Sequence, residues 1–347
     1  MRTRLFHPGG GRVTLKQLKY LVGIADSGLN ITSAAERLYT SQPGISKQLK
    51  QLEAELGVQL FTRKGKSLAA ITPAGREVIA RARKILREVG NITSLASDLT
   101  AELDGTLSIA TTHTQARYVL PEVIRAFRER YPRVDLELHQ GTSEQIVELV
   151  STNKVDFAIA TGSQELFPHL TLLPIYNWHR IVLVPKDHPL ARETKPIDLK
   201  ALADYPLVTY VFSGTGESSF KRAFREEGLE PRVVFTARDA DIIKTYVRMG
   251  MGVGVIASMA FECIDREDLV AIDAHNLFPR VTTWLGFPRD MVLRGYMVDF
   301  IHLFAPHYAP RLIRDAARAQ TQEEVDSLVR EVALPLRAGC EQDTAAR

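Results

Sequence analysis

The strongest constraint on the fold is a pair of short helical patterns joined by a tight turn, in the stretch NITSAAERLYTSQPGISKQLKQLEAELG. Asn30 or Thr32 can cap the first helix, and Ser41 can cap the second. Pro43 falls in the first turn of the second helix, where its missing N–H group costs little, and Gly57 ends that helix. Two short helices around such a turn predict a helix-turn-helix.

The second helix of this pair carries polar side chains on its N-terminal half and outer face. Glutamine can pair with an adenine edge, lysine with guanine or phosphate, and serine with base edges or phosphate. The following stretch, LFTRKGKSLAAIT, predicts two short strands around a basic turn, a wing suited to the sugar-phosphate backbone. The candidate DNA contacts are Thr40, Ser41, Gln42, Pro43, Ser46, Lys47, Lys50, Arg63, Lys64 and Lys66.

Charge separates this head from the rest of the chain. Residues 1–70 contain eleven Lys/Arg and four Asp/Glu, whereas the remaining residues contain 33 and 37. A basic head on a slightly acidic body indicates that only the head meets a polyanion. A solvated basic surface on a generic helical hairpin is the alternative, and the agreement of caps, turn, outer face and wing favours DNA binding.

From about residue 105 the pattern changes to alternating strands and helices. Such alternation predicts open α/β sheets with buried parallel strands, in which ligands bind at the carboxyl ends of the strands. The predicted strands are LSIATT, VDLELHQ, VDFAIAT, HRIVLVP, PLVTYV, RVVFTAR and VGVIAS. The predicted helices are LPEVIRAFRERYP, SEQIVELVSTN, DLKALADY, ESSFKRAFREEG and ADIIKTYVRMG.

The first of these strands is followed by TTHTQAR, a row of hydrogen-bonding side chains at the point where the strand ends and a helix begins. Thr112, Thr114 and Gln115 are therefore candidate ligand contacts, because hydroxyls, an amide and free backbone N–H groups suit a small carboxylate or sulfate. Helix capping and ordinary turn hydrogen bonds explain the shape of the motif at least as well. His113 is predicted to pack or to form hydrogen bonds, since no aspartate orienter or nucleophile elbow accompanies it.

The head resembles the winged helix-turn-helix of LysR-type transcriptional regulators. Ser-Gln-Pro, the Leu-Glu-x-x-Leu-Gly ending, the Phe-x-Arg wing and Thr-Pro-x-Gly all occur in AAERLYTSQPGISKQLKQLEAELGVQLFTRKGKSLAAITPAG in the family's order. A long helix at about 73–100 follows, with a heptad-like apolar stripe of Val78, Ile85, Val89, Ile92 and Leu95. It could pack on its own domain. The resemblance instead implies that it pairs two subunits, whose heads would read a two-fold DNA site.

The body is similar to a LysR-type subgroup that controls sulfur-assimilation genes. IATTHTQARYVLPEVI, DFAIAT and VVFTARDADIIKTYVRMGMGVGVIASMA carry this resemblance. It implies two α/β subdomains joined by crossover strands, one at about 105–175 plus 280–310 and the other at about 176–279. It also implies an effector pocket between them. The effector contacts that it implies are Thr112, Thr114, Gln115, Thr161 and Thr215.

One position departs from the subgroup. Glu217 stands in Thr-Gly-Glu-Ser, where the subgroup often has Thr-Gly-Arg-Ser. A carboxylate in place of a cation beside an anion site could reverse the local preference for charge.

The predicted fold class is therefore multidomain, combining α+β and α/β architecture. An N-terminal winged helix-turn-helix precedes a linker helix, a periplasmic-binding-protein-like effector domain and a tail with helical charge patterning and a polar end. Val13-Thr14-Leu15 aligns with the family's usual Met-x-Leu start, which makes Val13 a candidate initiator and the preceding residues a non-native extension. The expected segments are 1–12 (extension), 13–72 (head), 73–104 (linker), 105–310 (effector domain) and 311–347 (tail).

The resemblance implies a cytoplasmic regulator that binds promoter DNA as a homodimer or homotetramer, with RNA polymerase as a further expected partner. Its effector would be a small anionic or zwitterionic sulfur-pathway metabolite: O-acetylserine or N-acetylserine, with sulfate or thiosulfate as anti-effector. A related regulator of sulfonate and sulfate-starvation genes that senses adenosine phosphosulfate is the nearest alternative. A solute-binding protein or an enzyme using the cleft is disfavoured, because the sequence carries a DNA-binding head and no signal peptide, and no placed acid, base or cofactor motif.

Other residue patterns carry no further site. No run of about 18 apolar residues predicts a membrane span, and the first twelve residues lack the apolar stretch of a secretory signal. The nine histidines show no zinc spacing, so no metal, cofactor or catalytic residue is expected. Cys263 and Cys340 match no metal or redox spacing, which predicts one ordinary cysteine and one in a mobile tail. Asp239 and Asp241 are expected to cap a helix at 240–249.

Overall fold

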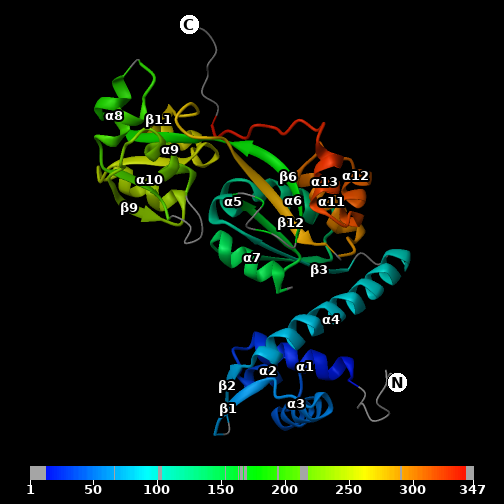
Figure 1. Cartoon of the computed structure of the whole chain (residues 1–347). Helices are drawn as coiled ribbons and strands as arrows, with labels where there is room; N and C mark the ends of the chain where they lie inside the picture. Colours follow the sequence, from blue (N-terminus) through cyan, green and yellow to red (C-terminus); the bar gives the residue numbers. More distant parts are fainter. Residues whose placement is uncertain are drawn as a thin grey trace, which may run out of the picture. The chain divides into compact units, whose positions relative to one another are not determined.

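The chain forms two compact units, Met1–Thr100 and Ala101–Arg347 (Figure 1). The computed structural model describes residues 13–340 except 66, 101–103, 153, 163, 165, 166, 168, 169, 194, 212–217 and 290, and leaves aside the side chains of 87 and 93–100. The predictions for residues 1–12, Lys66, Thr215, Glu217 and the polar end of the tail lie outside the described residues. No helix in the described part is long and apolar enough to cross a membrane.

The first unit is the predicted winged helix-turn-helix. Asn30 caps the first helix of the pair by accepting hydrogen bonds from the N–H groups of Thr32 and Ser33, and Ser41 caps the second. Gly57 ends that helix in the left-handed region, at φ 68°. The elements are α1 (Leu15–Asp26), α2 (Ile31–Arg37), α3 (Gln42–Leu56), β1 (Phe61–Lys64), β2 (Ser67–Ile71) and α4 (Pro73–Thr100).

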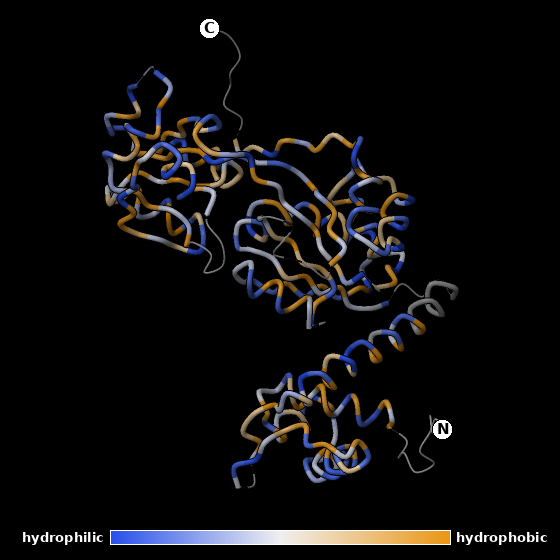
Figure 2. The backbone as a smooth tube through the Cα atoms, viewed as in Figure 1, coloured by the Kyte–Doolittle hydropathy of each residue, from blue (hydrophilic) through white to orange (hydrophobic). Residues whose placement is uncertain are grey.

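The apolar residues of the long helix α4 fall into two groups, one buried in the head and one exposed. Ile79 and Ala82 are buried in the core of the head, and Arg83 forms a 2.6 Å ion pair with Asp26 of α1. Further along the helix, Ile85 and Ile92 are 46% and 62% exposed. Hydrophobic and hydrophilic bands alternate along the α4 tube in Figure 2. The start of α4 therefore packs on its own head, and its later apolar residues remain available to another surface.

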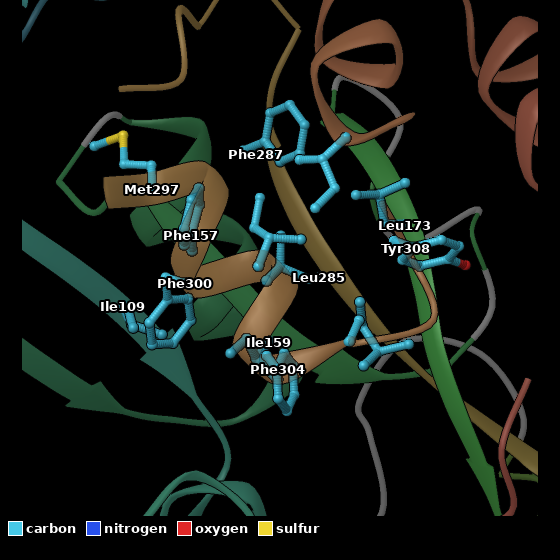
Figure 3. Close-up of a cluster of buried hydrophobic side chains, with 14 of the residues drawn as sticks. Ile109, Phe157, Ile159, Leu173, Leu285, Phe287, Met297, Phe300, Phe304 and Tyr308 are labelled. Carbon is cyan, nitrogen blue, oxygen red and sulfur yellow. The ribbon is translucent and has the colours of Figure 1, made fainter. Parts of the chain in front are cut away.

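The second unit contains two five-stranded sheets. The first has the strand order β4-β3-β5-β12-β6, with β3 parallel to β4 and β5, and β12 antiparallel to both of its neighbours. Apolar side chains of its strands pack against α11 in a large core (Figure 3). The strands are β3 (Gly105–Thr111), β4 (Val134–Gln140), β5 (Phe157–Thr161), β6 (Leu170–Trp178) and β12 (Val281–Pro288). The helices of this half are α5 (His113–Tyr118), α6 (Leu120–Arg130), α7 (Ser143–Ser151) and α11 (Gly295–Phe304).

The second sheet has the order β11-β7-β10-β8-β9. Strands β8, β9 and β10 run parallel, and β7 is antiparallel to β10 and β11. The strands are β7 (Arg180–Pro185), β8 (Leu207–Tyr210), β9 (Val233–Ala237), β10 (Val253–Ala257) and β11 (Leu269–Asp273). The helices are α8 (Leu199–Ala203), α9 (Ser219–Glu226) and α10 (Ala240–Arg248), with short 3-10 turns η2 (Pro189–Arg192), η3 (Ser258–Ala260) and η4 (Cys263–Glu267).

The prediction of parallel sheets was incomplete, because each sheet is mixed. All seven predicted strands are present, but β6, β11 and β12 were missed. Pro174 interrupts the strand signal of β6, and the pairing of β12 with β6 shifts register between Thr283 and Trp284. Their pairing joins segments about a hundred residues apart, which local sequence patterns do not reveal.

The helical patterning predicted for the tail is confirmed, whereas the mobile setting expected for its cysteine, Cys340, is wrong. Two helices, α12 (Pro310–Arg318) and α13 (Gln322–Val329), bury Ile313 and Val325 in the core beside β6. Figure 1 shows both helices grouped with α11, and the chain then running back along β6. The tail is thus an integral layer of the second unit.

Residues 332–340, here the C-terminal strap, tie this layer to the end of β6 and to the 3-10 turn η4. Asn177 donates a backbone hydrogen bond to the carbonyl of Pro335 (2.9 Å) and accepts one from Arg337 (2.8 Å). At the end of the strap, Cys340 forms a disulfide with Cys263. The prediction that the two cysteines are unrelated to each other is therefore wrong. The two cysteines are 77 positions apart, so only the folded chain brings them together.

Candidate functional sites

The candidate DNA surface gathers at the start of α3. Ser41, Gln42, Pro43, Lys47 and Lys50 are exposed. The amide of Gln42 donates a weak 3.4 Å hydrogen bond to the hydroxyl of Ser46, leaving both groups near solvent. This end of α3 therefore presents amide, hydroxyl and ammonium groups as the sequence predicts.

Two of the predicted DNA contacts are engaged within the head. The hydroxyl of Thr40 accepts a 3.3 Å hydrogen bond from Tyr20. In the wing, the guanidinium of Arg63 lies 3.6 Å from the carboxylate of Glu53, which also accepts hydrogen bonds from the N–H groups of Leu60 and Phe61. Arg63 thus helps to hold the wing against α3, whereas Lys64 at its tip is exposed.

Two threonines at the carboxyl ends of adjacent parallel strands form the centre of the candidate effector site. Thr112 follows β3 and occupies the N-cap position of α5, yet its hydroxyl makes no capping hydrogen bond. Thr161 ends β5 and is partly exposed. By contrast, the N-cap threonines Thr142 and Thr321 both cap their helices through the side chain. The capping alternative therefore does not account for Thr112.

Gln115 lies behind this edge and is fully engaged. It is 1% exposed, accepts a hydrogen bond from the Tyr176 hydroxyl, and donates one to the Thr283 hydroxyl (3.4 Å). Its amide nitrogen also lies 4.0 Å from the sulfur of Met259. Because these partners come from β6, β12 and η3, Gln115 fixes α5 against these three elements.

Thr114 faces the second sheet. Burial raises the pKa of the Tyr210 phenol, while hydrogen bonds from the Ala257 N–H group (3.2 Å) and the Thr114 hydroxyl act in the opposite direction. We call Thr112, Thr114 and Thr161 the hydroxyl edge. Thr112 and Thr161 lie at the ends of β3 and β5 of the first sheet, Thr114 lies on α5, and Tyr210 links the edge to the second sheet.

His113, Asp239 and Asp241 bring ligand atoms to within 4.8 Å of one another. The two carboxylates already have protein partners: Asp239 caps α10 through the Ile242 N–H group (2.8 Å), as predicted, and Asp241 accepts a 2.6 Å hydrogen bond from Tyr118. The carboxylates thus hold α10 and α5 in place, and the set does not require a metal to explain it.

A buried charge network stands beside this cluster. The Lys244 ammonium is 3% exposed and donates to the Asp265 carboxylate at 2.9 Å. Arg248 contacts the other oxygen of Asp265 at 2.7 Å. Burial by itself would raise the pKa of Asp265, but hydrogen bonds from Lys244, the Glu262 N–H group and Arg248 hold it below its usual value.

Several residues around the hydroxyl edge escaped the sequence analysis. They lie on five different elements, β6, β7, β8, η3 and β12, and are Tyr176, Arg180, Tyr210, Met259 and Thr283. Only Arg180 and Tyr210 fell inside predicted strands, where their sequence position gave no sign of a shared site. The register of Thr283 opposite Thr161 is visible only once β5 and β12 pair.

Comparison with known proteins agrees with this architecture. The profile described as "Bacterial regulatory helix-turn-helix protein, lysR family" matches residues 15–76, and "LysR substrate binding domain" matches 100–309. The transcriptional regulator CysB of Haemophilus influenzae is 46% identical over 90% of this chain and 97% of its own length. The regulator cbl of Escherichia coli K12 is 40% identical over 90% of this chain and 99% of its own.

A solved structure extends the likeness to the second unit. The cofactor-binding domain of the Cbl transcriptional regulator is 40% identical, with a TM-score of 0.58 over 63% of this chain and 96% of that domain. Both family profiles match in the expected order, and full-length relatives exceed 30% identity. The chain belongs to the LysR family of DNA-binding transcriptional regulators.

Proposed function

We propose that this regulator controls genes of sulfur assimilation and cysteine biosynthesis and responds to a small effector at the hydroxyl edge. The effector is O-acetylserine or N-acetylserine, with sulfate or thiosulfate as anti-effector. The observation that carries the proposal is the Thr112 hydroxyl, which makes no helix-capping hydrogen bond and lies with Thr161 at the carboxyl ends of adjacent parallel strands. Likeness to CysB supports the gene class.

The head binds promoter DNA through the start of α3 and the wing. The exposed side chains Gln42, Lys47 and Lys50 enter the major groove, and Lys64 contacts phosphates. The exposed residues Ile85 and Ile92 of α4 pair two subunits, giving a dimer and then a tetramer. DNA and regulator share the cytoplasm, where RNA polymerase is the further partner.

Effector binding acts by shifting a population. A ligand held by the hydroxyl edge and by groups of the second sheet stabilises one arrangement of the two sheets over another. The favoured arrangement of the two sheets in turn favours one arrangement of the subunits, and this sets the spacing between the DNA-binding heads.

Gln42→Ala is expected to weaken specific promoter binding by about 10–100-fold, because a bidentate base contact contributes about 1–3 kcal/mol. Fluorescence anisotropy with promoter and random DNA measures the effect. Gln51→Ala is the matched control. Gln51 is an exposed glutamine in the same helix, and its amide donates a 2.9 Å hydrogen bond to the carboxylate of Glu55. Equal losses for both variants, or none for Gln42→Ala, would remove Gln42 from the base-reading surface.

Thr112→Ala is expected to weaken acetylserine binding about tenfold, the effect of losing one hydrogen bond of about 1–1.5 kcal/mol. Calorimetric titration of the full chain measures it, and promoter affinity without effector should stay unchanged. Thr321→Ala removes another N-cap threonine, on α13, and serves as control. Wild-type effector affinity in Thr112→Ala would contradict the assignment.

Gln115→Ala is expected to weaken the effector response indirectly. It leaves the buried hydroxyls of Tyr176 and Thr283 without the amide partner, at a cost of about 1–3 kcal/mol in stability. Thermal unfolding and effector titration should therefore change together in this variant. A weaker response at unchanged stability would indicate direct contact with the ligand instead.

A regulator that senses adenosine phosphosulfate is the second candidate function. The likeness to Cbl, at 40% identity over nearly the whole of its cofactor-binding domain, favours it. Titration with adenosine phosphosulfate separates the two, because binding of that nucleotide without binding of either acetylserine would select the second candidate.

A further inference from the structure

Arg180, the first residue of β7, carries a charge without a carboxylate partner among the described residues. Its Nη2 donates a 3.0 Å hydrogen bond to the Ser219 hydroxyl at the start of α9. Its guanidinium carbon lies 5.7 Å from the ring centres of both Trp178 and Phe278. Its Nη1 is buried and has no hydrogen-bond partner within the described chain.

This arrangement is costly for a cation. Burial lowers the pKa of the Arg180 guanidinium to about 10, which still leaves it charged at neutral pH. Cation–π attraction to the two aromatic faces offsets part of the free-energy cost of removing the guanidinium from water, by about 0.5–2 kcal/mol per contact. The rings offer no oxygen acceptor, however, so among the described residues the buried Nη1 lacks a hydrogen-bond partner. An anion that accepts from Nη1 would relieve that cost.

The position of Arg180 connects it to the hydroxyl edge. In the antiparallel pair of β7 and β10, Arg180 stands opposite Ala257, whose N–H group donates to the Tyr210 phenol at 3.2 Å. The same phenol interacts with the Thr114 hydroxyl, and the charge of Arg180 acts on it. Thr114 of α5 and Arg180 of β7 therefore both act on the Tyr210 phenol.

We infer that Arg180 binds the anionic group of the effector, while the hydroxyl edge holds its neutral polar groups. This inference rests on the proposed effector site and assigns that site its charge preference. A planar guanidinium already fixed by two rings and Ser219 offers Nη1 to a carboxylate or sulfate oxygen in a set direction. The ligand then bridges β7 of the second sheet and the carboxyl ends of β3 and β5 in the first.

The test varies both the protein and the charge of the ligand. Full-length wild type and Arg180→Met are titrated calorimetrically with N-acetylserine and with N-acetylserinamide, which lacks the negative charge. Wild type is expected to prefer the acid by about 10–100-fold, the range for a hydrogen-bonded charge pair. Arg180→Met should lose this preference by weakening binding of the acid alone. Retention of the full preference in a folded Arg180→Met protein would overturn the inference.

Arg117→Met is the matched control. It also removes one positive charge near the hydroxyl edge, but Arg117 is already paired with Glu262 at 3.0 Å and Asp241 at 3.9 Å. The preference should persist in this variant, and its equal loss would point to general electrostatics instead of a contact by Arg180. If circular dichroism shows that Arg180→Met is unfolded, Arg180→Lys replaces it, with an expected preference between wild type and none. Full retention in that lysine variant would count against a directed guanidinium contact.

Sulfate titration separates this inference from the proposed function. Sulfate binding by wild type that Arg180→Met abolishes, without binding of either acetylserine, would keep the anion role of Arg180 and reject the acetylserine assignment. Binding of N-acetylserine with an unchanged acid preference in Arg180→Met would do the reverse. A wild type that binds neither sulfate nor N-acetylserine would overturn both.

Discussion

Lys244→Met is expected to lower the free energy of unfolding of the second unit by about 3–5 kcal/mol, the usual cost of removing one partner from a buried ion pair. The variant leaves Asp265, 2% exposed, with Arg248 as its remaining cationic partner. Urea denaturation followed by tryptophan fluorescence measures the change. Both tryptophans of the chain, Trp178 and Trp284, lie in the second unit, so the signal reports on that unit.

Lys200→Met provides the matched control for Lys244→Met. Lys200 is an exposed lysine on α8 of the same unit, so its replacement should change stability by less than about 0.5 kcal/mol. A double-mutant cycle with Asp265→Asn isolates the interaction between the two side chains. The double variant should be much less destabilised than the sum of the two single variants, because each single change already removes the pair. A Lys244→Met protein as stable as wild type would show that the pair contributes no net stability.

The same network predicts a sensitivity to acid. The pKa of Asp265 lies below its usual value in the folded chain, so the unfolded chain binds a proton there more readily. Its contribution to stability is therefore complete above the unfolded pKa of about 3.9 and is lost as pH falls through the folded value. Asp265→Asn should remove this part of the pH dependence in urea titrations carried from about pH 5 downward.

Cys340→Ser is expected to destabilise the second unit by about 4.5 kcal/mol under oxidising conditions. The disulfide closes a long loop between residues 77 positions apart, and in the chain-entropy account such a link restricts the unfolded chain by about that amount. Tryptophan-detected urea unfolding measures it. Cys263→Ser should give the same value, and the double variant should add nothing further.

Reductant is the control for this disulfide. Excess dithiothreitol should bring wild type to the stability of Cys340→Ser and leave the variant unchanged. A reducing compartment keeps thiols unpaired, so the disulfide holds the strap only under oxidising conditions. Wild type that is no more stable oxidised than reduced would show that the strap is held by its backbone hydrogen bonds alone.

Local signals in the sequence were sufficient to predict the head. Ser41, Pro43 and Gly57 each act within a few residues of their own helix, so the caps and the turn of the helix-turn-helix follow from neighbouring side chains. The same holds for the strand-to-helix passage at Thr112, although the sequence could not tell whether its hydroxyl caps α5. In the structure the Thr112 hydroxyl makes no capping hydrogen bond to α5.

Long-range pairing explains what the sequence did not reveal. Strand β12 pairs with β5 and β6, more than a hundred residues earlier, and the strap reaches Asn177 and Cys263 from the end of the chain. Neither contact leaves a periodic trace in its own segment. Two groups that complete the candidate effector site, Tyr176 of β6 and Thr283 of β12, depend on these pairings and therefore emerged only with the fold.

The most direct test of the account is a footprint of the full-length chain on promoter DNA of a cysteine-biosynthesis operon, with and without O-acetylserine and N-acetylserine. We expect specific protection at moderate salt, a changed footprint on addition of one acetylserine, and reversal of that change by sulfate or thiosulfate. Specific protection that none of these ligands alters would contradict the proposed effector. Failure to distinguish this promoter from random DNA would contradict the assignment to sulfur genes altogether.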